Sequence, residues 1–520
     1  MTLMYDNGPV APRDLLIRGA RIVELGPSAG PVIPEAAEPP RPAGEPVDLR
    51  IRGGVVIALA PTLPDRGADV LDADGRWLLP GLWDHHVHLA QWARTLDRLD
   101  LAGCHGPADV VARVRSALAE STAPVLTGFG YRSATWSHPP TVAELDAVSG
   151  DRPVVLISGD AHNGWLNSAA LALLGVPPRV GPLDENDWFP VFARLDRLPR
   201  DEAADEAAYR EALRRASARG IVGVTDMEFG RGFEDWPSRA GRGIGGLRVR
   251  VATYPETLEE VIALGLRSGT PLLPGDDLLT MGPLKVISDG SLNTRTAYCT
   301  EPYVDDPASR GTLNVAPDEL ERLLTRATEH GLTAAVHAIG DAAVGHAVDA
   351  FAATGARGSI EHAQLLTPAD ITRMAGLPVT ASVQPAHLLD DRDVTQLCWP
   401  DRADRCFPLR SLHEGGVVLA FGSDAPVAPL DPWLAMAAAV HRSADERPAW
   451  NPAEALTPAQ ALAASTDGAG TVAVASPADL VLVDDDPLAP CNDNVVAAQR
   501  LRQAHVTLTM VGGRITHDAL

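Results

Sequence analysis

Short apolar segments recur through the middle of the chain, separated by stretches rich in alanine, leucine, arginine and glutamate. This alternation is typical of an α/β fold, in which parallel strands are joined by crossover helices. Eight segments are candidate strands: residues 77–88, 221–227, 247–253, 278–288, 333–338, 359–362, 379–384 and 417–422. Eight parallel strands predict a (β/α)8 TIM-like barrel, in which the chemistry lies at the carboxyl ends of the strands.

The two ends of the chain have a different pattern, with β-forming residues grouped around glycine. The pattern occurs at residues 14–24, 48–60, 478–484 and 506–516. It predicts a small β-sandwich domain formed by both chain ends, residues 1–76 and 475–520, with the barrel at 77–474. The gap after the first barrel strand is too long for one crossover helix, so we expect an inserted subdomain at about 90–215.

The composition is that of a globular protein, with 45% hydrophobic and 22% charged residues, and it excludes disordered and fibrous folds. No apolar run approaches the roughly 18 residues of a membrane span. The first residues lack the basic and apolar regions of a secretory signal. Five scattered cysteines without CxxC spacing fit a reducing compartment. We therefore expect a cytoplasmic protein.

The net charge of -24 restricts the partners that the protein can bind. This charge would repel nucleic acid phosphates and anionic membranes, and the sequence contains no basic patch that could offset it. We therefore expect a small-molecule substrate, no nucleic acid and no membrane. The acidic surface leaves a homodimer open.

His86 and His88 are separated by one residue near the end of the first predicted strand. A period of two along a strand sends both imidazoles to one face, where they can hold a metal ion. Alone this pattern is weak, because 15 histidines in 520 residues give about 0.4 such pairs by chance. Its position strengthens it, because other predicted strands also end on polar residues. These are Lys285, His337, His362 and Asp424.

Each of these residues also has a purely structural interpretation. A single buried histidine is more often a hydrogen-bonded core residue than a metal ligand. An aspartate before Ala-Pro, as at Asp424, is common in turns. The full set, placed at the ends of the first, fourth, fifth, sixth and eighth strands, favours the metal site.

Lys285 is the only lysine among the 44 lysine and arginine residues of the chain. A chain that uses arginine wherever a general cation suffices would keep a lysine where a primary amine is required. Chance retention of a surface lysine is the alternative. The apolar residues around Lys285 argue against it, because they predict a strand that ends in a turn.

Eight segments carry a resemblance that extends over nearly the whole chain. They are residues 79–88 (LPGLWDHHVH), 160–168, 285–292 (KVISDGSL), 337–341 (HAIGD), 360–362, 384–387, 422–427 (GSDAPV) and 478–484. In this order they resemble the amidohydrolase superfamily of metal-dependent hydrolases. The resemblance is greatest to the amidohydrolase-3 branch, which includes YtcJ-like and N-substituted formamide deformylase-like enzymes.

The resemblance implies two divalent metal ions, for which zinc is expected, and a set of metal-binding residues. These are His86, His88, Lys285, His337, His362 and Asp424. In the family, the H-x-H pair holds one ion and the two later histidines hold the other. A carboxylated lysine bridges both ions, and the last aspartate binds metal and handles protons.

A carbamate on Lys285 is also reasonable on physical grounds. Carbon dioxide adds only to a neutral amine, which burial beside dications favours, whereas a guanidinium stays protonated. The carbamate offers two anionic oxygens to ions about 3.5 to 4 Å apart, the usual separation in two-metal sites.

The implied reaction is hydrolysis of an amide-type C–N bond by a metal-bridging hydroxide, with Asp424 transferring protons. N-substituted formamides, N-acyl amines and cyclic amides all stay open as substrates. Two alternatives are a mononuclear deaminase of the same superfamily and a catalytically inactive barrel that acts as a scaffold. Lys285 counts against the first, and the complete ligand set counts against the second.

His162 and His387 are further catalytic candidates, because either could polarise a substrate carbonyl, although a structural loop histidine is an equal interpretation. Asp289 and Arg295 are expected to order the loop after the fourth strand or to contact substrate. Asp341 is a candidate for orienting the nearby ligand His337 through a hydrogen bond.

His85 occupies a position where a small residue is usual, between the aspartate and the first histidine ligand. Strand parity directs its side chain away from the barrel lumen. We therefore expect His85 to pack outside the lumen or behind the ligands rather than to bind metal.

Overall fold

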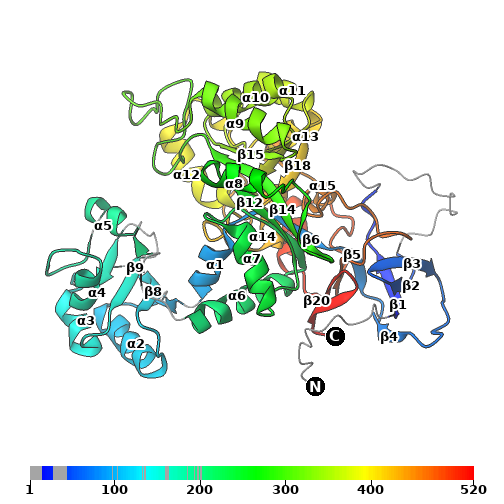
Figure 1. Cartoon of the computed structure of the whole chain (residues 1–520), viewed down its shortest axis with the longest axis horizontal. Helices are drawn as coiled ribbons and strands as arrows, with labels where there is room; N and C mark the ends of the chain where they lie inside the picture. Colours follow the sequence, from blue (N-terminus) through cyan, green and yellow to red (C-terminus); the bar gives the residue numbers. More distant parts are fainter. Residues whose placement is uncertain are drawn as a thin grey trace. The chain divides into compact units, whose positions relative to one another are not determined.

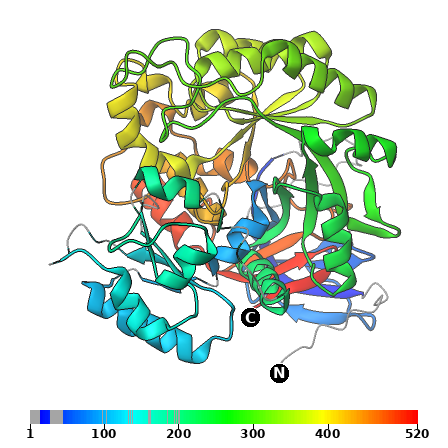
Figure 2. The same ribbon diagram turned by 60° about the vertical axis from the view of Figure 1, so that its left-hand side comes forward.

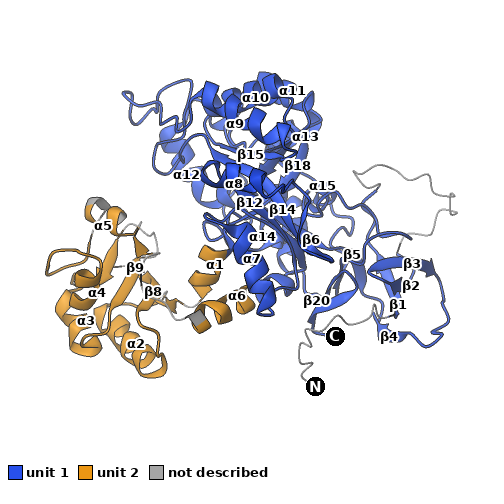
Figure 3. Cartoon of the chain, viewed as in Figure 1, with its two compact units in different colours: residues 1–89, 213–520 blue, residues 90–212 orange. Residues whose placement is uncertain are grey.

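The computed structural model describes residues 14–26, 44–96, 98–101, 103–131, 133, 136, 138–158, 163–183, 185–192, 194, 195, 198 and 202–520. The chain forms two compact units, one of residues 1–89 and 213–520 and the other of residues 90–212 (Figure 3). The residue range of the second unit, 90–212, nearly coincides with that of the insertion expected at about 90–215. No helix in the described part of the chain has the length and apolar character needed to span a membrane.

The larger unit contains the predicted (β/α)8 barrel. Its eight strands follow one another in chain order, and each hydrogen-bonded pair is parallel. They are β6 (Leu82–Val87), β11 (Ile221–Asp226), β12 (Arg248–Thr253), β14 (Asp276–Ile287), β15 (Ala334–Ala338), β16 (Gly358–His362), β17 (Val379–Val383) and β18 (Val418–Phe421). Each predicted segment overlaps one of these strands, so the barrel prediction is confirmed.

Helices follow the strands and cover the outside of the barrel (Figure 1). They include α7 (Gly232–Gly241), α8 (Leu258–Ala263), α9 (Pro317–Glu329), α10 (Asp341–Thr354), α11 (Pro368–Ala375), α12 (Leu388–Cys398), α13 (Leu409–Glu414), α14 (Pro432–His441), α15 (Pro458–Ala463) and α16 (Asn494–Arg502). Helix α10 shows how they pack, because its Val344, Val348 and Phe351 belong to one apolar core with strand residues Val336 and Ile360.

The first and last barrel strands meet at their carboxyl ends. The backbone N–H of Asp424 donates to the carbonyl of His86 at 2.6 Å, and the N–H of His88 donates to the carbonyl of Ala425 at 2.9 Å. Gly422 permits this approach, because a Cβ there would lie 2.7 Å from the backbone nitrogen of His86. Closure of the barrel therefore brings the H-x-H pair beside Asp424.

Strands from both chain ends pair in a second sheet of the same unit (Figure 2). They are β1 (Leu15–Ile22), β2 (Val47–Arg52), β3 (Val55–Ala60), β4 (Asp69–Asp72), β5 (Trp77–Pro80), β19 (Leu480–Val483), β20 (Val506–Val511) and β21 (Arg514–Asp518). Ile17 and Leu49 share an apolar core with Leu482 and Leu508. The predicted strand 77–88 is two strands, because β5 pairs with β19 and β1 in this sheet and only β6 belongs to the barrel.

The smaller unit has a sheet of its own, in the order β10 (Gly164–Leu166), β9 (Val154–Ser158), β8 (Leu126–Tyr131) and β7 (Leu99–Asp100). Its helices are α2 (Pro107–Glu120), α3 (Val142–Ser149), α4 (Ser168–Leu173) and α5 (Glu185–Phe192), and the boundaries with the larger unit fall within α1 (Leu89–Leu96) and α6 (Glu202–Ser217). Separate apolar clusters, which include the buried Trp165 and Trp188, form its interior. The insertion is therefore a folded unit rather than an extended loop.

Candidate metal centre

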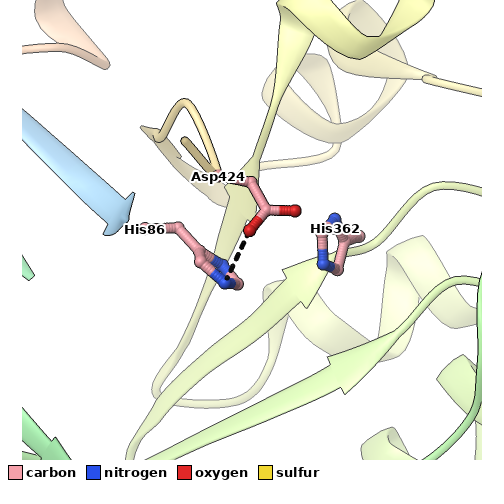
Figure 4. A group of neighbouring side chains, drawn as sticks. All are labelled: His86, His362 and Asp424. Carbon is pink, nitrogen blue, oxygen red and sulfur yellow. Dashed lines mark ion pairs between the residues drawn. The ribbon is translucent and has the colours of Figure 1, made fainter. Parts of the chain in front are cut away.

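Three predicted ligands form a compact group at the carboxyl ends of three barrel strands. One ligand atom from each of His86, His362 and Asp424 lies within 4.8 Å of the others. The His86 and Asp424 side chains face each other in Figure 4, with 3.5 Å between Nε2 and Oδ1, and the His362 ring lies opposite them. Two imidazoles and a carboxylate at this spacing suit a divalent cation.

Two of these residues have strained backbones. His362 has φ of 71° and Asp424 has φ of 56°. For residues other than glycine, this left-handed conformation costs about 1–3 kcal/mol and persists only where the surrounding structure enforces it. Such strain is concentrated at functional sites, so it supports a functional role for both residues.

His88 joins the group through Asp424, with 3.5 Å between His88 Nε2 and Asp424 Oδ1. Burial lowers the pKa of His88 to about 4, although the Asp424 carboxylate acts in the opposite direction. The ring of Phe229 stacks on the His88 ring at 5.5 Å between centroids. His88 is therefore a neutral imidazole held between a carboxylate and an aromatic ring.

Lys285, on β14, is almost completely buried, with 1% of its surface exposed. Its Nζ lies 3.2 Å from His86 Nε2. Burial lowers the pKa of Lys285, while the carboxylates of Glu361 and Asp424 oppose this effect. The single lysine of the sequence thus lies inside the histidine group, where a neutral amine is favoured.

His337 lies beside His362, with 4.6 Å between the ring centroids. Its Nδ1 is 3.0 Å from Asp289 Oδ1. The Asp289 carboxylate also accepts hydrogen bonds from the backbone N–H groups of Ile339 and Gly340. Asp289 therefore fixes the chain around His337.

One expectation for a neighbouring residue needs correction. Asp341 does not orient His337, because its carboxylate accepts from the Thr300 N–H at 2.8 Å and pairs with Arg405 at 3.3 Å. Arg295 pairs with Asp305 at 2.7 Å, which agrees with the expectation that it orders the loop after β14.

Of the two further catalytic candidates, His387 lies at the site. Its Nε2 is 3.9 Å from Asp424 Oδ2, and its ring centroid is 5.9 Å from that of His362. His162, the other candidate, lies outside the described residues.

Sequence reasoning missed Glu361. This residue is fully buried, and its Oε2 accepts a hydrogen bond from His86 Nδ1 at 2.7 Å. Burial alone would raise the pKa of Glu361, but the hydrogen bond from His86, with a smaller contribution from the hydroxyl of Ser359, outweighs it and lowers the pKa to about 2. The ionised carboxylate holds the proton of His86 on Nδ1 and leaves Nε2 with a free lone pair. The available signal was a carboxylate in an apolar strand, directly before a predicted ligand.

His85 is not outside the barrel, contrary to the parity argument. Val224 and Asp226 of β11 pair with Asp84 and Val87 of β6, so β6 carries one extra residue at this point. Such a bulge changes which side chains face inward. His85 therefore lines a cavity of about 210 Å³ in the barrel interior, together with Thr225, Ser359, Glu361 and Ser382.

The histidines of the group fit the chemistry of a metal site. Among their buried nitrogens, Nδ1 of His88, Nδ1 of His337, Nδ1 of His362 and Nε2 of His387 have no hydrogen-bond partner. Burial, with neighbouring imidazoles, lowers the pKa of His362 well below its ordinary value. A buried nitrogen without a partner is costly in a protein interior, and a neutral imidazole such as that of His362 is a suitable metal ligand.

Asp424 completes the charge balance of the group. Burial would raise the pKa of Asp424, but His86, His387, His88 and Lys285 outweigh this effect and lower it. The carboxylate is therefore ionised, as metal binding requires.

Comparison with known proteins gives relatives that match most of the chain. It is 30% identical over 447 residues to the protein LONG AFTER FAR-RED 3 of Arabidopsis thaliana, with 78% of this chain and 76% of the relative covered. It is 26% identical to the putative amidohydrolase YtcJ of Bacillus subtilis, with 86% and 90% covered. It is 25% identical to the N-substituted formamide deformylase of Arthrobacter pascens, with 90% and 94% covered.

A solved structure has the same architecture. An uncharacterised metal-dependent hydrolase from Pyrococcus furiosus superposes with a TM-score of 0.77 at 25% identity, covering 91% of this chain and all of that one. The family model described as amidohydrolase family matches residues 69–517. The chain therefore belongs to the amidohydrolase family of metal-dependent hydrolases.

Proposed function

We propose that this protein hydrolyses an amide-type C–N bond in a small molecule and uses two divalent metal ions, for which we propose zinc. The convergence of His86, His362 and Asp424 around the buried Lys285 carries the proposal. Relatives named amidohydrolase and N-substituted formamide deformylase support the bond type. N-substituted formamides, N-acyl amines and cyclic amides are the candidate substrates.

We propose that the two ions are held by imidazole nitrogens, by the carbamate of the lysine and by a carboxylate, which are groups that suit divalent cations. These groups belong to His86, His88, Lys285, His337, His362 and Asp424. When bound, divalent ions would supply Lewis acidity towards the substrate carbonyl and make water acidic near neutral pH.

Asp424 is the proposed proton-transfer group. Its carboxylate is ionised, and its two oxygens face different partners, Oδ1 towards His86 and His88 and Oδ2 towards His387. It would accept a proton from the attacking water and return it to the leaving nitrogen, which then departs as a neutral amine. His387 would donate to the substrate carbonyl oxygen and stabilise the negative charge that develops there.

Lys285 is proposed to carry the carbamate. The neutral amine would attack carbon dioxide, form an N–C bond and release one proton. Burial favours the required neutral amine, and the resulting anion would replace an ammonium group that repels cations. A carbamate on this lysine also explains why arginine does not replace it.

The test is an activity screen of metal-loaded protein over formyl-, acyl- and cyclic-amide panels, with the product amine detected directly. We expect amine release with at least one panel and none after the metal is removed. Absence of amine release from every panel by protein shown to contain metal would contradict the proposal.

A further inference from the structure

One exposed aromatic residue lies directly beside the proposed metal ligands. Phe229 follows β11, the strand next to β6, at the carboxyl end where His88 lies. Phe229 is 54% exposed, and no other phenylalanine, tyrosine or tryptophan among the described residues of the larger unit is exposed. Single exposed apolar side chains are common on protein surfaces, but this one lies against a proposed metal ligand, where a bound substrate could cover it and gain the free energy of apolar burial.

The Phe229 ring is held in place from two sides. It stacks on His88 with 25° between the ring planes. It also lies 4.8 Å from the ring of Tyr254, which follows the next strand, β12. Tyr254 is itself anchored, because its hydroxyl donates to the carbonyl of Met227 at 2.6 Å. Rings at these separations attract each other, so Phe229 is a fixed surface rather than a free side chain.

A second apolar side chain follows the strand on the other side of β6. Val427 comes three residues after Asp424, its N–H donates to the Asp424 carbonyl at 2.9 Å, and its side chain is exposed. The loops on both sides of the H-x-H strand therefore present apolar groups at the end of the barrel that carries the ligands.

Resting on the proposed function, we propose that Phe229 binds an aryl or bulky alkyl substituent of the amide substrate. The scissile amide would lie at the polar ligand group, and its substituent would pack on the exposed part of the Phe229 ring. Small amides such as N-methylformamide would leave this surface uncovered. The protein would thus select substrates by the apolar group next to the amide.

The experiment compares kcat/KM for N-benzylformamide and N-methylformamide in wild type, Phe229→Ala and Phe229→Tyr. We expect Phe229→Ala to lower the benzyl-to-methyl ratio about tenfold, a normal effect for an apolar pocket contact. Phe229→Tyr keeps the ring and should keep the ratio. Leu264→Ala, which removes an exposed apolar side chain at the end of α8, is the matched control and should leave the ratio unchanged.

Measuring the metal content of Phe229→Ala distinguishes binding of the substrate's apolar group from structural support of the ligand His88. Equal losses for both amides, together with metal loss in Phe229→Ala, would make Phe229 a support for the ligand and overturn the proposal, as would an unchanged ratio. Saturation-transfer NMR with benzamide covers the case in which neither formamide is hydrolysed. A signal that is present in wild type and lost in Phe229→Ala would support binding of an aryl group by Phe229, even if the proposed reaction fails. The absence of a signal in wild type would overturn the proposal that Phe229 binds such a group.

Discussion

Asp424 is the residue at which the polar groups of the site meet, since three imidazoles face its carboxylate. Asp424→Asn keeps the shape of the side chain but removes the proton-accepting oxygen. We expect it to lower kcat by at least ~10², the lower range for general acid-base catalysis. Steady-state kinetics on protein of measured metal content checks this, and near-normal turnover would rule out the proton-transfer role.

We predict that metal binding requires the primary amine of Lys285. Lys285→Arg should lose most of the bound metal while circular dichroism shows the fold intact, because a guanidinium cannot form a carbamate. Lys285→Ala should regain part of its activity with small carboxylates such as acetate. Mass spectrometry that finds an unmodified lysine in gently handled protein with two metal ions bound would refute the bridging carbamate.

Glu361 acts on the metal site through His86, because it fixes the ring and keeps the Nε2 lone pair available. Loss of such a partner typically weakens metal binding 10–100-fold. We expect a loss of about this size for Glu361→Ala in chelator competition. Ser359→Ala, which removes the hydroxyl that donates to the other oxygen of Glu361, is the milder control. An unchanged metal affinity in Glu361→Ala would show that His86 needs no such partner.

At the level of elements, the site depends on how closely β18 approaches β6. A Cβ at Gly422 would lie 2.7 Å from the backbone nitrogen and Cβ of His86. Gly422→Ala should therefore displace His86, weaken metal binding and lower the melting temperature. Gly345→Ala, within α10, is the control, because a Cβ there meets nothing within 4 Å and alanine favours the helix. Equal metal affinity in both variants would contradict the importance of this contact.

The alternation of strands and helices could be predicted from sequence, because it depends on local hydrophobic pattern. The division of residues 77–88 into β5 and β6 could not, since both halves are apolar and only pairing distinguishes them. The orientation of His85 was mispredicted for a related reason. A bulge breaks the period of two that the parity argument assumed, and nothing in the local sequence marks it.

The ligand candidates could be found because they lie near the ends of five of the barrel strands, whereas their supporting partners depend on the folded structure. Asp341 is close to His337 in sequence, yet the carboxylate that lies 3.0 Å from His337 Nδ1 is that of Asp289, just after the neighbouring strand β14. Glu361 was missed because parity places adjacent residues on opposite faces, and its contact with His86 crosses the barrel.

At the level of the whole molecule, the barrel brings ligands from distant parts of the chain to one end. His86 comes from the first strand, Lys285 from the middle of the chain and Asp424 from just after the last strand. The opposite end of the barrel meets residues 466–477, which line an open cavity of about 1140 Å³.

The central claim is that these side chains bind divalent metal, and the most direct test is metal analysis of purified, metal-reconstituted protein by mass spectrometry. The account predicts two divalent ions per chain in wild type. It also predicts that the double replacement of His86 and Asp424 by alanine removes most of this metal. Failure of wild type to retain stoichiometric metal, or equal metal content in the double variant, would contradict the account.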